Sequence, residues 1–320
     1  MRGRYKRLKL AYVFPGQGAQ YVGMGRELMD RYPVARDTVA AADEALGFSL
    51  SKLFLEGPEE DLRLTYHTQP ALLTVSVAAW RVFQSLQPAC QPAAVAGHSL
   101  GEYTALVAAG AMSFEDAVRL VHHRGKLMDE AVPAGQGAMS AVLGMAADAL
   151  EQVCAEASTD GEVVELANLN CPGQIVISGS AKAVERAGQL AKERGARRVM
   201  PLVVSGPFHC SLMRPAAGQL SAALAAATLQ SAAAPVVANV DAVPRTQPDD
   251  LRAALEQQLY SPVRWEADVR AMLDLGVEGF VEFGPGTVLS GLIKKVDRSV
   301  VTYHVEDESS LQEALQATAH

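Results

Sequence analysis

The sequence predicts an α/β protein, because two stretches of the chain have different orders of strands and helices. Over residues 10–132, short apolar runs alternate with longer helical segments, an order typical of parallel β-α units. Residues 133–204 instead follow the order strand, helix, strand, strand, helix, strand, which is that of a ferredoxin-like module. We expect residues 1–132 and 205–320 to form one large domain, with residues 133–204 inserted into it as a small domain.

Strands are expected where a short apolar run is bounded by glycine, proline or polar residues. Helices are expected where the apolar spacing continues for ten residues or more. The predicted strands cover residues 10–14, 93–96, 138–143, 163–168, 174–179 and 198–204. Within residues 16–29 a turn followed by a helix is predicted. Further helices are predicted over 71–83, 99–109, 147–157 and 182–194. Pro70 stands just before the second helix, and Ser113 with Asp116 predicts the start of a further one.

The composition is that of a chain able to bury a large core. Of 320 residues, 49% are hydrophobic and 20% are charged, which excludes extensive disorder. The formal net charge of −8 argues against a generally basic nucleic-acid-binding protein, although it is compatible with a local basic patch. No uncharged apolar run reaches the length of a membrane span, so no membrane attachment is expected.

Two features bear on the cellular compartment. The basic start, residues 1–9, is followed by an apolar stretch that ends at Pro15, too early for a signal peptide. The cysteines are far apart and form no C-x-x-C pair, so we expect reduced thiols and neither a disulfide framework nor a zinc site. They are Cys90, Cys154, Cys171 and Cys210. Together these features predict a cytoplasmic protein.

The sharpest local signal is Gly97-His98-Ser99-Leu100-Gly101, a Gly-x-Ser-x-Gly pattern between a predicted strand and a predicted helix. A nucleophile elbow requires this context, because small flanking residues let the serine stand exposed on a tight turn. The following helix supplies backbone N–H groups and the positive end of its dipole. The alternative is an ordinary glycine-containing turn whose serine caps the helix. We favour Ser99 as a nucleophile.

A serine nucleophile needs a base, and His209 is the candidate. It lies in a loop that follows a predicted strand, and such loops gather at the edge of a parallel sheet where active sites form. An acid usually orients such a histidine. Asp241, Glu278 and Glu282 are all conceivable, and the sequence singles out none of them.

The glycine-rich segment 15–20 follows the first predicted strand and lacks the Gly-Lys-Ser/Thr ending of a phosphate-binding P-loop. It could supply oxyanion-binding N–H groups that face the serine, or it could form only a tight turn. Arg124 lies on the helix after the elbow. Because arginines on helices are usually solvated, this pattern alone predicts a surface position for Arg124.

Eight motifs occur in order along the chain. They are FPGQGAQ (14–20), TQPAL (68–72), GHSLGEY (97–103), RGKLMDEAVP (124–133), NLNCPGQIVISG (168–179), GPFHCSLM (206–213), QLYSPVRW (258–265) and EFGPGTVLSGL (282–292). Together they resemble the malonyl-CoA:acyl carrier protein transacylases of fatty-acid synthesis, and polyketide-synthase acyltransferases share several of them. The resemblance runs from about residue 10 to about residue 295. It implies an α/β-hydrolase-like large domain with a ferredoxin-like small one.

The resemblance also implies a role for each matching residue. Ser99 resembles the acylated nucleophile and His209 its base. Arg124 resembles the arginine that binds the malonyl carboxylate, in contrast to the surface position that its pattern predicts. The other implied roles are the oxyanion hole (Gln17 and the Leu100 N–H), the carbonyl that orients the histidine in place of an acid (Gln258), lesser substrate contacts (Gln69, Asn168 and Asn170) and exclusion of a 2-methyl branch (Phe208).

The reaction that the resemblance implies is the transfer of a malonyl group from malonyl-CoA to the phosphopantetheine thiol of acyl carrier protein. The transfer passes through a malonyl-serine with ping-pong kinetics, and it supplies extender units for fatty-acid synthesis. No metal and no redox cofactor is expected. The alternatives are a free-standing polyketide-type acyltransferase, a serine esterase or thioesterase, and a non-catalytic module that binds acyl-CoA or the carrier.

Carrier proteins of this pathway are usually acidic, so basic surface is a candidate docking site. Six cations against two carboxylates fall within residues 182–198, and a second basic cluster lies at 294–298. Either cluster could steer the carrier, although a solvated helix face explains them nearly as well. The first cluster is Lys182, Arg186, Lys192, Arg194, Arg197 and Arg198, and the second is Lys294, Lys295 and Arg298. We expect a monomer that binds a CoA thioester and no nucleic acid.

Overall fold

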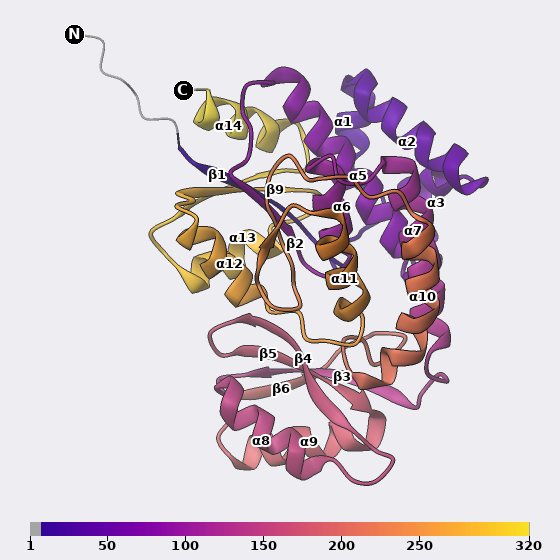
Figure 1. Cartoon of the computed structure of the whole chain (residues 1–320), viewed down its shortest axis with the longest axis vertical. Coiled ribbons are helices and arrows are strands. Elements are labelled where there is room, and N and C mark those ends of the chain that lie inside the picture. Colours follow the sequence, from indigo (N-terminus) through magenta and orange to yellow (C-terminus); the bar gives the residue numbers. More distant parts are fainter. Residues whose placement is uncertain (1–7, 320) are drawn as a thin grey trace.

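Two β-sheets form the centre of the computed structural model, which describes residues 8–319 (Figure 1). The strands are β1 (Leu10–Phe14), β2 (Ala94–Gly97), β3 (Gly137–Leu143), β4 (Val164–Cys171), β5 (Gln174–Ser180), β6 (Arg198–Pro201), β7 (Val236–Val237), β8 (Pro244–Arg245), β9 (Gly279–Phe283) and β10 (Val301–Val305). The larger sheet has the order β10-β9-β1-β2-β7-β8, and its neighbouring strands are parallel except for β7 and β8. The smaller sheet has the antiparallel order β4-β5-β3-β6.

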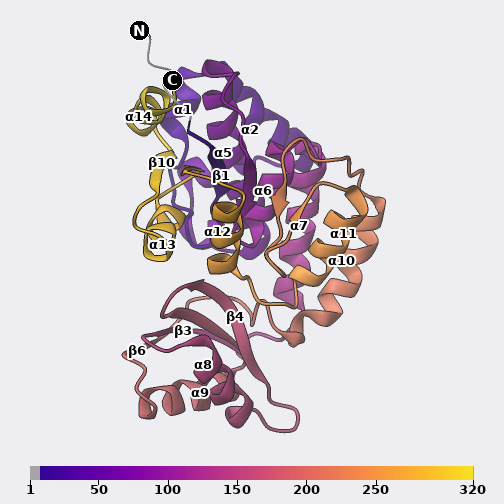
Figure 2. The same ribbon diagram turned by 60° about the vertical axis from the view of Figure 1, so that its left-hand side comes forward.

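Helices cover both sheets (Figures 1 and 2). They are α1 (Arg26–Arg31), α2 (Pro33–Leu46), α3 (Leu50–Glu56), α4 (Glu59–Leu62), α5 (Thr65–Leu86), α6 (Leu100–Ala108), α7 (Phe114–Glu130), α8 (Ala147–Ala157), α9 (Ala181–Glu193), α10 (Arg214–Ala226), α11 (Pro248–Gln258), α12 (Trp265–Asp274), α13 (Val288–Val296) and α14 (Glu308–Thr318). Helices α5 and α6 pack on one face of the larger sheet, and α12 and α13 pack on the other.

The alternation of side chains along β1 explains these two layers. Leu10, Tyr12 and Phe14 belong to the core cluster under α5 and α6, whereas Ala11 and Val13 belong to the cluster under α12 and α13. All five side chains are buried. Successive residues of a strand point to opposite faces, so a strand that is apolar at every position is covered on both sides. The carboxyl end of β1 therefore lies in the middle of the protein.

The smaller sheet uses its two faces differently. Val142, Ile175 and Ile177 pack under α8 and α9, on the side away from the larger sheet. Their strand neighbours Ala141 and Val176 point to the opposite face and line a pocket that the larger sheet also borders. The predicted order strand, helix, strand, strand, helix, strand is confirmed.

Backbone hydrogen bonds tie the smaller sheet to a segment of chain outside it. The Leu169 N–H donates to the Val263 carbonyl at 2.8 Å, and the Val263 N–H donates to the Ala167 carbonyl at 2.8 Å. These bonds connect β4 to the segment between α11 and α12. The smaller sheet falls wholly within residues 133–204, and the division of the chain into domains at those bounds stays a prediction.

Two element predictions were wrong in extent. Within residues 16–29 turns precede α1, as predicted, but the last strand of the smaller sheet ends at Pro201 instead of continuing to residue 204. Helix α5 begins at Thr65, so Pro70 lies inside it and not before it. A proline lacks the N–H that would bond the carbonyl four residues earlier. That carbonyl belongs to Tyr66, and it bonds Nδ1 of His122 on α7 at 2.7 Å instead.

The basic start of the chain falls mostly outside the described residues, which begin at Leu8. Over residues 8–319, none of the helices combines the length and the apolar character that crossing a bilayer requires. The cysteine thiols are all free and buried.

Candidate active site

Ser99 lies on a sharp turn between β2 and α6. Its backbone angles are φ 50° and ψ −106°, a combination that places a non-glycine residue under strain. A Cβ atom on Gly97 would lie 1.8 Å from the Gly101 carbonyl carbon, and one on Gly101 would lie 2.1 Å from the Phe14 carbonyl oxygen. Glycine is therefore required on both sides of the serine. The Ser99 side chain makes no capping hydrogen bond to α6, so the reading as an ordinary N-cap does not hold.

The Ser99 hydroxyl contacts His209. The distance from Oγ of Ser99 to Nε2 of His209 is 2.7 Å, and Nδ1 of His209 lies 3.0 Å from the carbonyl oxygen of Gln258. His209 is 4% exposed and has a left-handed φ of 58°. The structure thus connects Ser99, His209 and the main-chain carbonyl of Gln258 by two successive hydrogen bonds. This carbonyl occupies the position that an acid holds in a Ser-His-Asp triad.

None of the three candidate acids orients the histidine. Asp241 pairs with Arg245 at 2.6 Å, and Glu278 accepts a hydrogen bond from the Lys9 N–H at 3.1 Å. Glu282 caps α13 instead, and its carboxylate accepts hydrogen bonds from the Leu289 and Ser290 N–H groups.

The His209 imidazole is neutral at physiological pH. Burial, and after it the positive charge of Arg124, lower the pKa of His209 to about 3. A neutral imidazole keeps a lone pair on Nε2, which can take the Ser99 proton.

Arg124 is buried beside the serine, so the surface position that its helix pattern predicted is wrong. It is 1% exposed, and its NH2 donates to Oγ of Ser99 at 3.0 Å and to Oε1 of Gln258 at 3.1 Å. Its NH1 donates to Oε1 of Gln69 at 2.8 Å. Over residues 8–319, no carboxylate forms a salt bridge with Arg124, and its Nε has no hydrogen-bond partner. Its hydrogen bonds go only to neutral groups, and the Glu102 carboxyl acts on its charge without forming an ion pair. A buried guanidinium without an ion-pair partner is a strong site for an anion.

A pocket of about 370 Å³ opens beside the elbow, between the two sheets. Gln17 and His98 line it from the larger sheet, and Asn168 and Asn170 line it from β4. Oδ1 of Asn170 lies 2.8 Å from Nε2 of His98, so β4 contacts the residue before the serine. Leu100 begins α6, and the first N–H groups of a helix have no partner within it. The Leu100 N–H is therefore suited to bind an oxyanion.

The remaining site candidate, Phe208, is 5% exposed and belongs to the large core cluster. It is adjacent in sequence to His209, and its ring packs close to Gly206, where a Cβ atom would lie 3.0 Å from it.

The sequence matches the acyl transferase domain family over residues 11–312. The chain belongs to this family. A relative in Bacillus subtilis named malonyl CoA-acyl carrier protein transacylase is 53% identical over 308 residues, which are 96% of each chain. A solved acyl carrier protein S-malonyltransferase from Vibrio cholerae is 51% identical, with a TM-score of 0.93 over 96% of this chain and 99% of that one. A malonyl-transacylase solved in complex with a type II polyketide-synthase acyl carrier protein is 46% identical, with a TM-score of 0.94 over 97% of this chain and 99% of that one.

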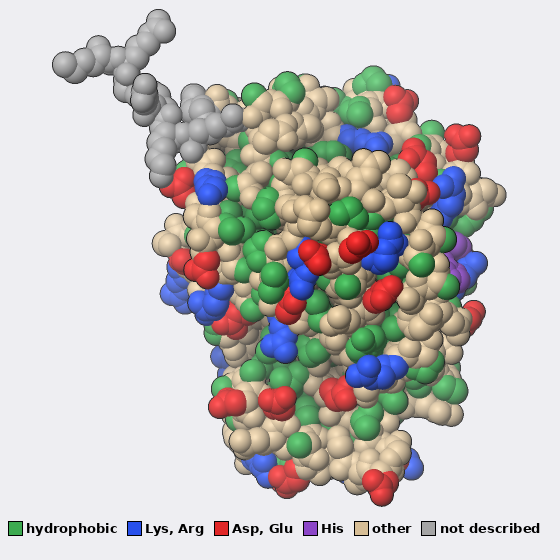
Figure 3. All heavy atoms as spheres, in the orientation of Figure 1, with side chains coloured by type: hydrophobic (Ala, Val, Ile, Leu, Met, Phe, Trp, Pro, Cys, Tyr) green, Lys and Arg blue, Asp and Glu red, His purple; other side chains and the backbone are tan. Residues whose placement is uncertain are grey.

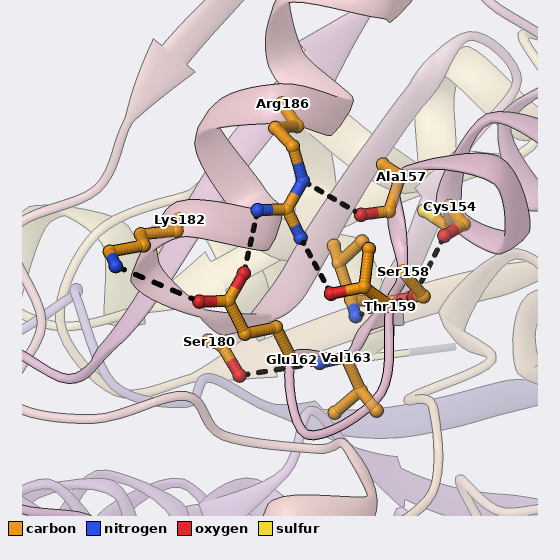
Figure 4. A network of polar contacts seen from close by, with 10 residues as sticks. Cys154, Ala157, Ser158, Thr159, Glu162, Val163, Ser180, Lys182 and Arg186 are labelled. Carbon is orange, nitrogen blue, oxygen red and sulfur yellow. Dashed lines mark hydrogen bonds and ion pairs between the residues drawn. The ribbon is translucent and has the colours of Figure 1, made fainter.

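Three of the six cations in the first basic cluster of this acyl transferase form ion pairs with nearby acids, and Figure 4 shows two of them. Glu162 lies 2.6 Å from Arg186 and 3.9 Å from Lys182, and Arg194 pairs with Glu156. Helix α9, which carries Lys182 and Arg186 and ends just before Arg194, packs on the face of the smaller sheet opposite to the pocket. On the face of the molecule in Figure 3, acidic and basic side chains are interspersed.

The second basic cluster lies nearer to the pocket of the acyl transferase. Helix α13 lines the pocket with Val288, Leu289 and Leu292. Nζ of Lys295, on the same helix, donates to Oε1 of Gln174 at 3.1 Å, and Gln174 also lines the pocket.

Three buried polar residues beneath Ser99 were missed by the sequence analysis. They are Glu102, Asn239 and Asp268. Burial raises the pKa of Glu102 to about 7 and that of Asp268 well above its usual range. Glu102 lies within the motif GHSLGEY, directly after the elbow. The one local signal for Asn239 is its position as a polar residue directly after a short apolar run.

Proposed function

We propose that this acyl transferase moves a malonyl group from coenzyme A to the phosphopantetheine thiol of an acyl carrier protein, through an ester on Ser99. The names of its relatives support these substrates. One observation carries the choice of malonyl: Arg124, buried and without a salt bridge, donates a hydrogen bond to Oγ of Ser99. The site thus places the nucleophile Ser99 next to a positive charge that a substrate carboxylate can pair with.

The carboxylate of malonyl distinguishes it from acetyl. A guanidinium can bind a carboxylate through two parallel hydrogen bonds, and the charge of Arg124 would then be compensated. A neutral acyl group would leave this charge buried and unpaired, which is costly. Gln69 accepts a hydrogen bond from NH1 of Arg124 and would keep the guanidinium oriented toward the substrate carboxylate. Asn168 and Asn170 would contact the pantetheine arm in the pocket.

The first half-reaction makes the malonyl ester. Nε2 of His209 takes the proton from Oγ of Ser99, and Oγ forms a bond to the thioester carbonyl carbon. The N–H groups of Gln17 and Leu100 would bind the oxyanion. When the tetrahedral intermediate collapses, the carbon–sulfur bond breaks and the CoA thiolate takes the proton from His209.

The second half-reaction reverses these steps with another thiol. The phosphopantetheine thiol gives its proton to His209 and attacks the ester carbon. The bond to Oγ then breaks, and Ser99 regains its proton from His209. One site serving two thiols gives ping-pong kinetics. The proposal needs no metal and no redox cofactor.

The carrier would approach over α13. This helix carries Lys294 and Lys295 as well as part of the wall of the pocket, and Arg298 follows it. Cations of the first cluster are instead paired with Glu156 and Glu162. We expect the enzyme to act as a monomer. A cytoplasmic location agrees with four free thiols, which persist in a reducing compartment.

A polyketide-type carrier is the second candidate acceptor, because one relative is solved with such a carrier. Competition between fatty-acid and polyketide holo carriers for the malonyl enzyme distinguishes the two. Faster discharge to the fatty-acid carrier supports the proposed role, and faster discharge to the other carrier contradicts it.

The experiment that tests the proposal is intact-protein mass spectrometry after brief mixing with malonyl-CoA or acetyl-CoA. We expect a malonyl adduct on the wild type that is absent from Ser99→Ala and is discharged by holo carrier protein. Acetyl-CoA should give little adduct. In Arg124→Ala, the malonyl adduct should form on the order of 10²–10³ times more slowly, since removing one partner of a buried charge pair costs about 3–5 kcal/mol. Release of free CoA without an adduct would indicate hydrolysis instead, and neither product would indicate a binding module.

A further inference from the structure

The backbone of Ser99 is held from outside its own helix. Its φ of 50° and ψ of −106° are adopted by a serine only where the surroundings fix them. The Ser99 N–H donates to Oδ1 of Asn239 at 2.8 Å, and its carbonyl accepts from Nε2 of Gln258 at 3.0 Å. Two side chains from distant parts of the sequence therefore determine the conformation of the elbow.

Asn239 closes the turn. In addition to accepting the Ser99 N–H, it donates from Nδ2 to the carbonyl of Gly97 at 2.8 Å. The two bonds span His98, so one amide ties both ends of the elbow together. Asn239 is 0% exposed, so water does not compete for these bonds.

The orientation of the Asn239 amide is itself fixed. Nδ2 also donates to Oδ2 of Asp268 at 2.8 Å, and the Asn239 N–H donates to Oε2 of Glu102 at 3.0 Å. The Asn239 carbonyl accepts from the Arg264 N–H at 3.0 Å. Each donor and acceptor of the residue is thus used, and its partners come from β2, the elbow, α6, α12 and the segment before α12.

The same network reaches the base. Nε2 of Gln258 lies 3.3 Å from Oδ1 of Asn239, and the Gln258 carbonyl is the group that contacts Nδ1 of His209. Asn239 and Gln258, whose side chains contact each other, therefore hold the Ser99 backbone, and the main chain of Gln258 also holds His209.

We propose that Asn239 is a positioning residue, whose amide holds Ser99 in the conformation from which Oγ reaches His209. The inference rests on the proposed role of Ser99 as nucleophile. Without the bond to Asn239, the Ser99 backbone can relax toward an ordinary φ, and Oγ then leaves its 2.7 Å contact with His209. Displacement of a reacting group by about 1 Å can lower a rate on the order of 10²-fold.

The test is the rate of Ser99 malonylation in Asn239→Ala, measured over a range of malonyl-CoA concentrations. We expect the rate at saturation to fall on the order of 10²-fold. The concentration for half-saturation should change little, because Arg124 and Gln69 still bind the carboxylate. A purely structural role would lower the thermal midpoint and leave the rate of the folded enzyme unchanged, and this result would overturn the proposal.

Ser310→Ala is the matched control. Ser310 is 4% exposed and bonds Asp307 in the capping box of α14, away from the elbow. Its loss should lower stability without slowing malonylation. A fluorophosphonate, which labels an activated serine without needing a carboxylate site, separates the two proposals. If malonyl-CoA fails on the wild type, the proposed function is wrong, and slower labelling of Asn239→Ala than of wild type still supports the role of Asn239.

A measurement on the wild type covers the case in which Asn239→Ala does not fold. The Ser99 amide should exchange its hydrogen at least about 10²-fold more slowly than an unprotected amide, since its partner is a buried oxygen. Exchange at the unprotected rate would overturn the proposal.

Discussion

Gly125 lies against the backbone of Tyr66 so closely that a Cβ atom at Gly125 would be 2.4 Å from the Tyr66 Cα atom. The two residues mark the closest approach of α7 to the start of α5. Arg124 precedes Gly125 on α7, and its partner Gln69 lies one turn after Tyr66 on α5. The glycine therefore sets the distance at which the guanidinium meets both Gln69 and Ser99.

Gly125→Ala should weaken malonyl selection. The new methyl group meets main-chain atoms that cannot rotate away, so α7 must shift and move Arg124. We expect malonylation to slow on the order of 10²-fold, and the free energy of unfolding to fall by about 1–3 kcal/mol. Malonyl-CoA titrations and urea unfolding measure the two effects.

Gly218→Ala is the control for that substitution. Gly218 lies on α10, and a Cβ atom there would meet nothing within 4 Å. This variant should keep the wild-type rate and gain up to about 1 kcal/mol of stability, because alanine loses less chain entropy on folding. Equal rates in both glycine variants would contradict the role assigned to Gly125.

Charge reversal on α13 should weaken use of the carrier. Lys295→Glu should raise the KM for holo carrier protein by roughly tenfold, since opposite charges steer association. Lys192→Glu, which reverses a charge of the first cluster on α9, is the control and should leave that KM unchanged. Steady-state transfer at fixed malonyl-CoA provides the comparison. A larger effect at Lys192 would move the docking site to α9.

Phe208→Ser should admit a branched acyl group. Its ring is buried and it directly precedes the base in the sequence, so we expect its removal to open space beside the acyl chain. We expect the ratio of methylmalonyl to malonyl transfer to rise by at least about tenfold, the scale of one methyl group in a tight pocket. The ratio is independent of how much variant folds, which matters because removal of a buried phenylalanine side chain costs about 3–5 kcal/mol. An unchanged ratio would remove Phe208 from the specificity site.

The elbow and its base could be predicted because their signals are local. Ser99 stands in a five-residue pattern between a strand and a helix, and His209 follows a strand. The small sheet was predictable for the same reason, since its strands and helices alternate in one continuous segment. The extent of α5 was not, because Pro70 is tolerated only where His122 bonds the carbonyl that the proline leaves free.

Features that depend on packing had no local signal. Arg124 has the pattern of a solvated helical arginine, and it is buried by contacts with residues far away in the sequence, namely Gln69, Ser99, Tyr103 and Gln258. The group that contacts Nδ1 of His209 is a main-chain carbonyl. Every residue has such a carbonyl, so the residue type gives no signal for it. The charge of the first cluster was counted over residues 182–198 alone. Glu156 and Glu162, which pair with two of its cations, lie earlier in the sequence and are brought to the cluster only by the fold.

The burial of His209 has a consequence for stability. An unfolded histidine binds a proton near pH 6.5, whereas burial lowers the pKa of folded His209 to about 3. Between these values the unfolded chain binds the proton and the native chain does not. The contribution of His209 to stability is therefore present above pH 6.5 and is lost as the pH falls toward 3.

Removal of the Arg124 charge should raise the pKa of His209. Arg124 is the second cause of the lowered value after burial, so Arg124→Ala should move it up while burial keeps it below that of a free histidine. Imidazole NMR titration of a sample labelled at histidine measures this directly. In the wild type the His209 signal should remain that of a neutral ring down to about pH 5, and Arg119→Ala, which removes an exposed arginine, should match it. A charged His209 ring at pH 6 in the wild type would contradict the assignment. A shift in Arg124→Ala would further imply that a malonyl carboxylate, by neutralising Arg124, strengthens the base as the substrate binds.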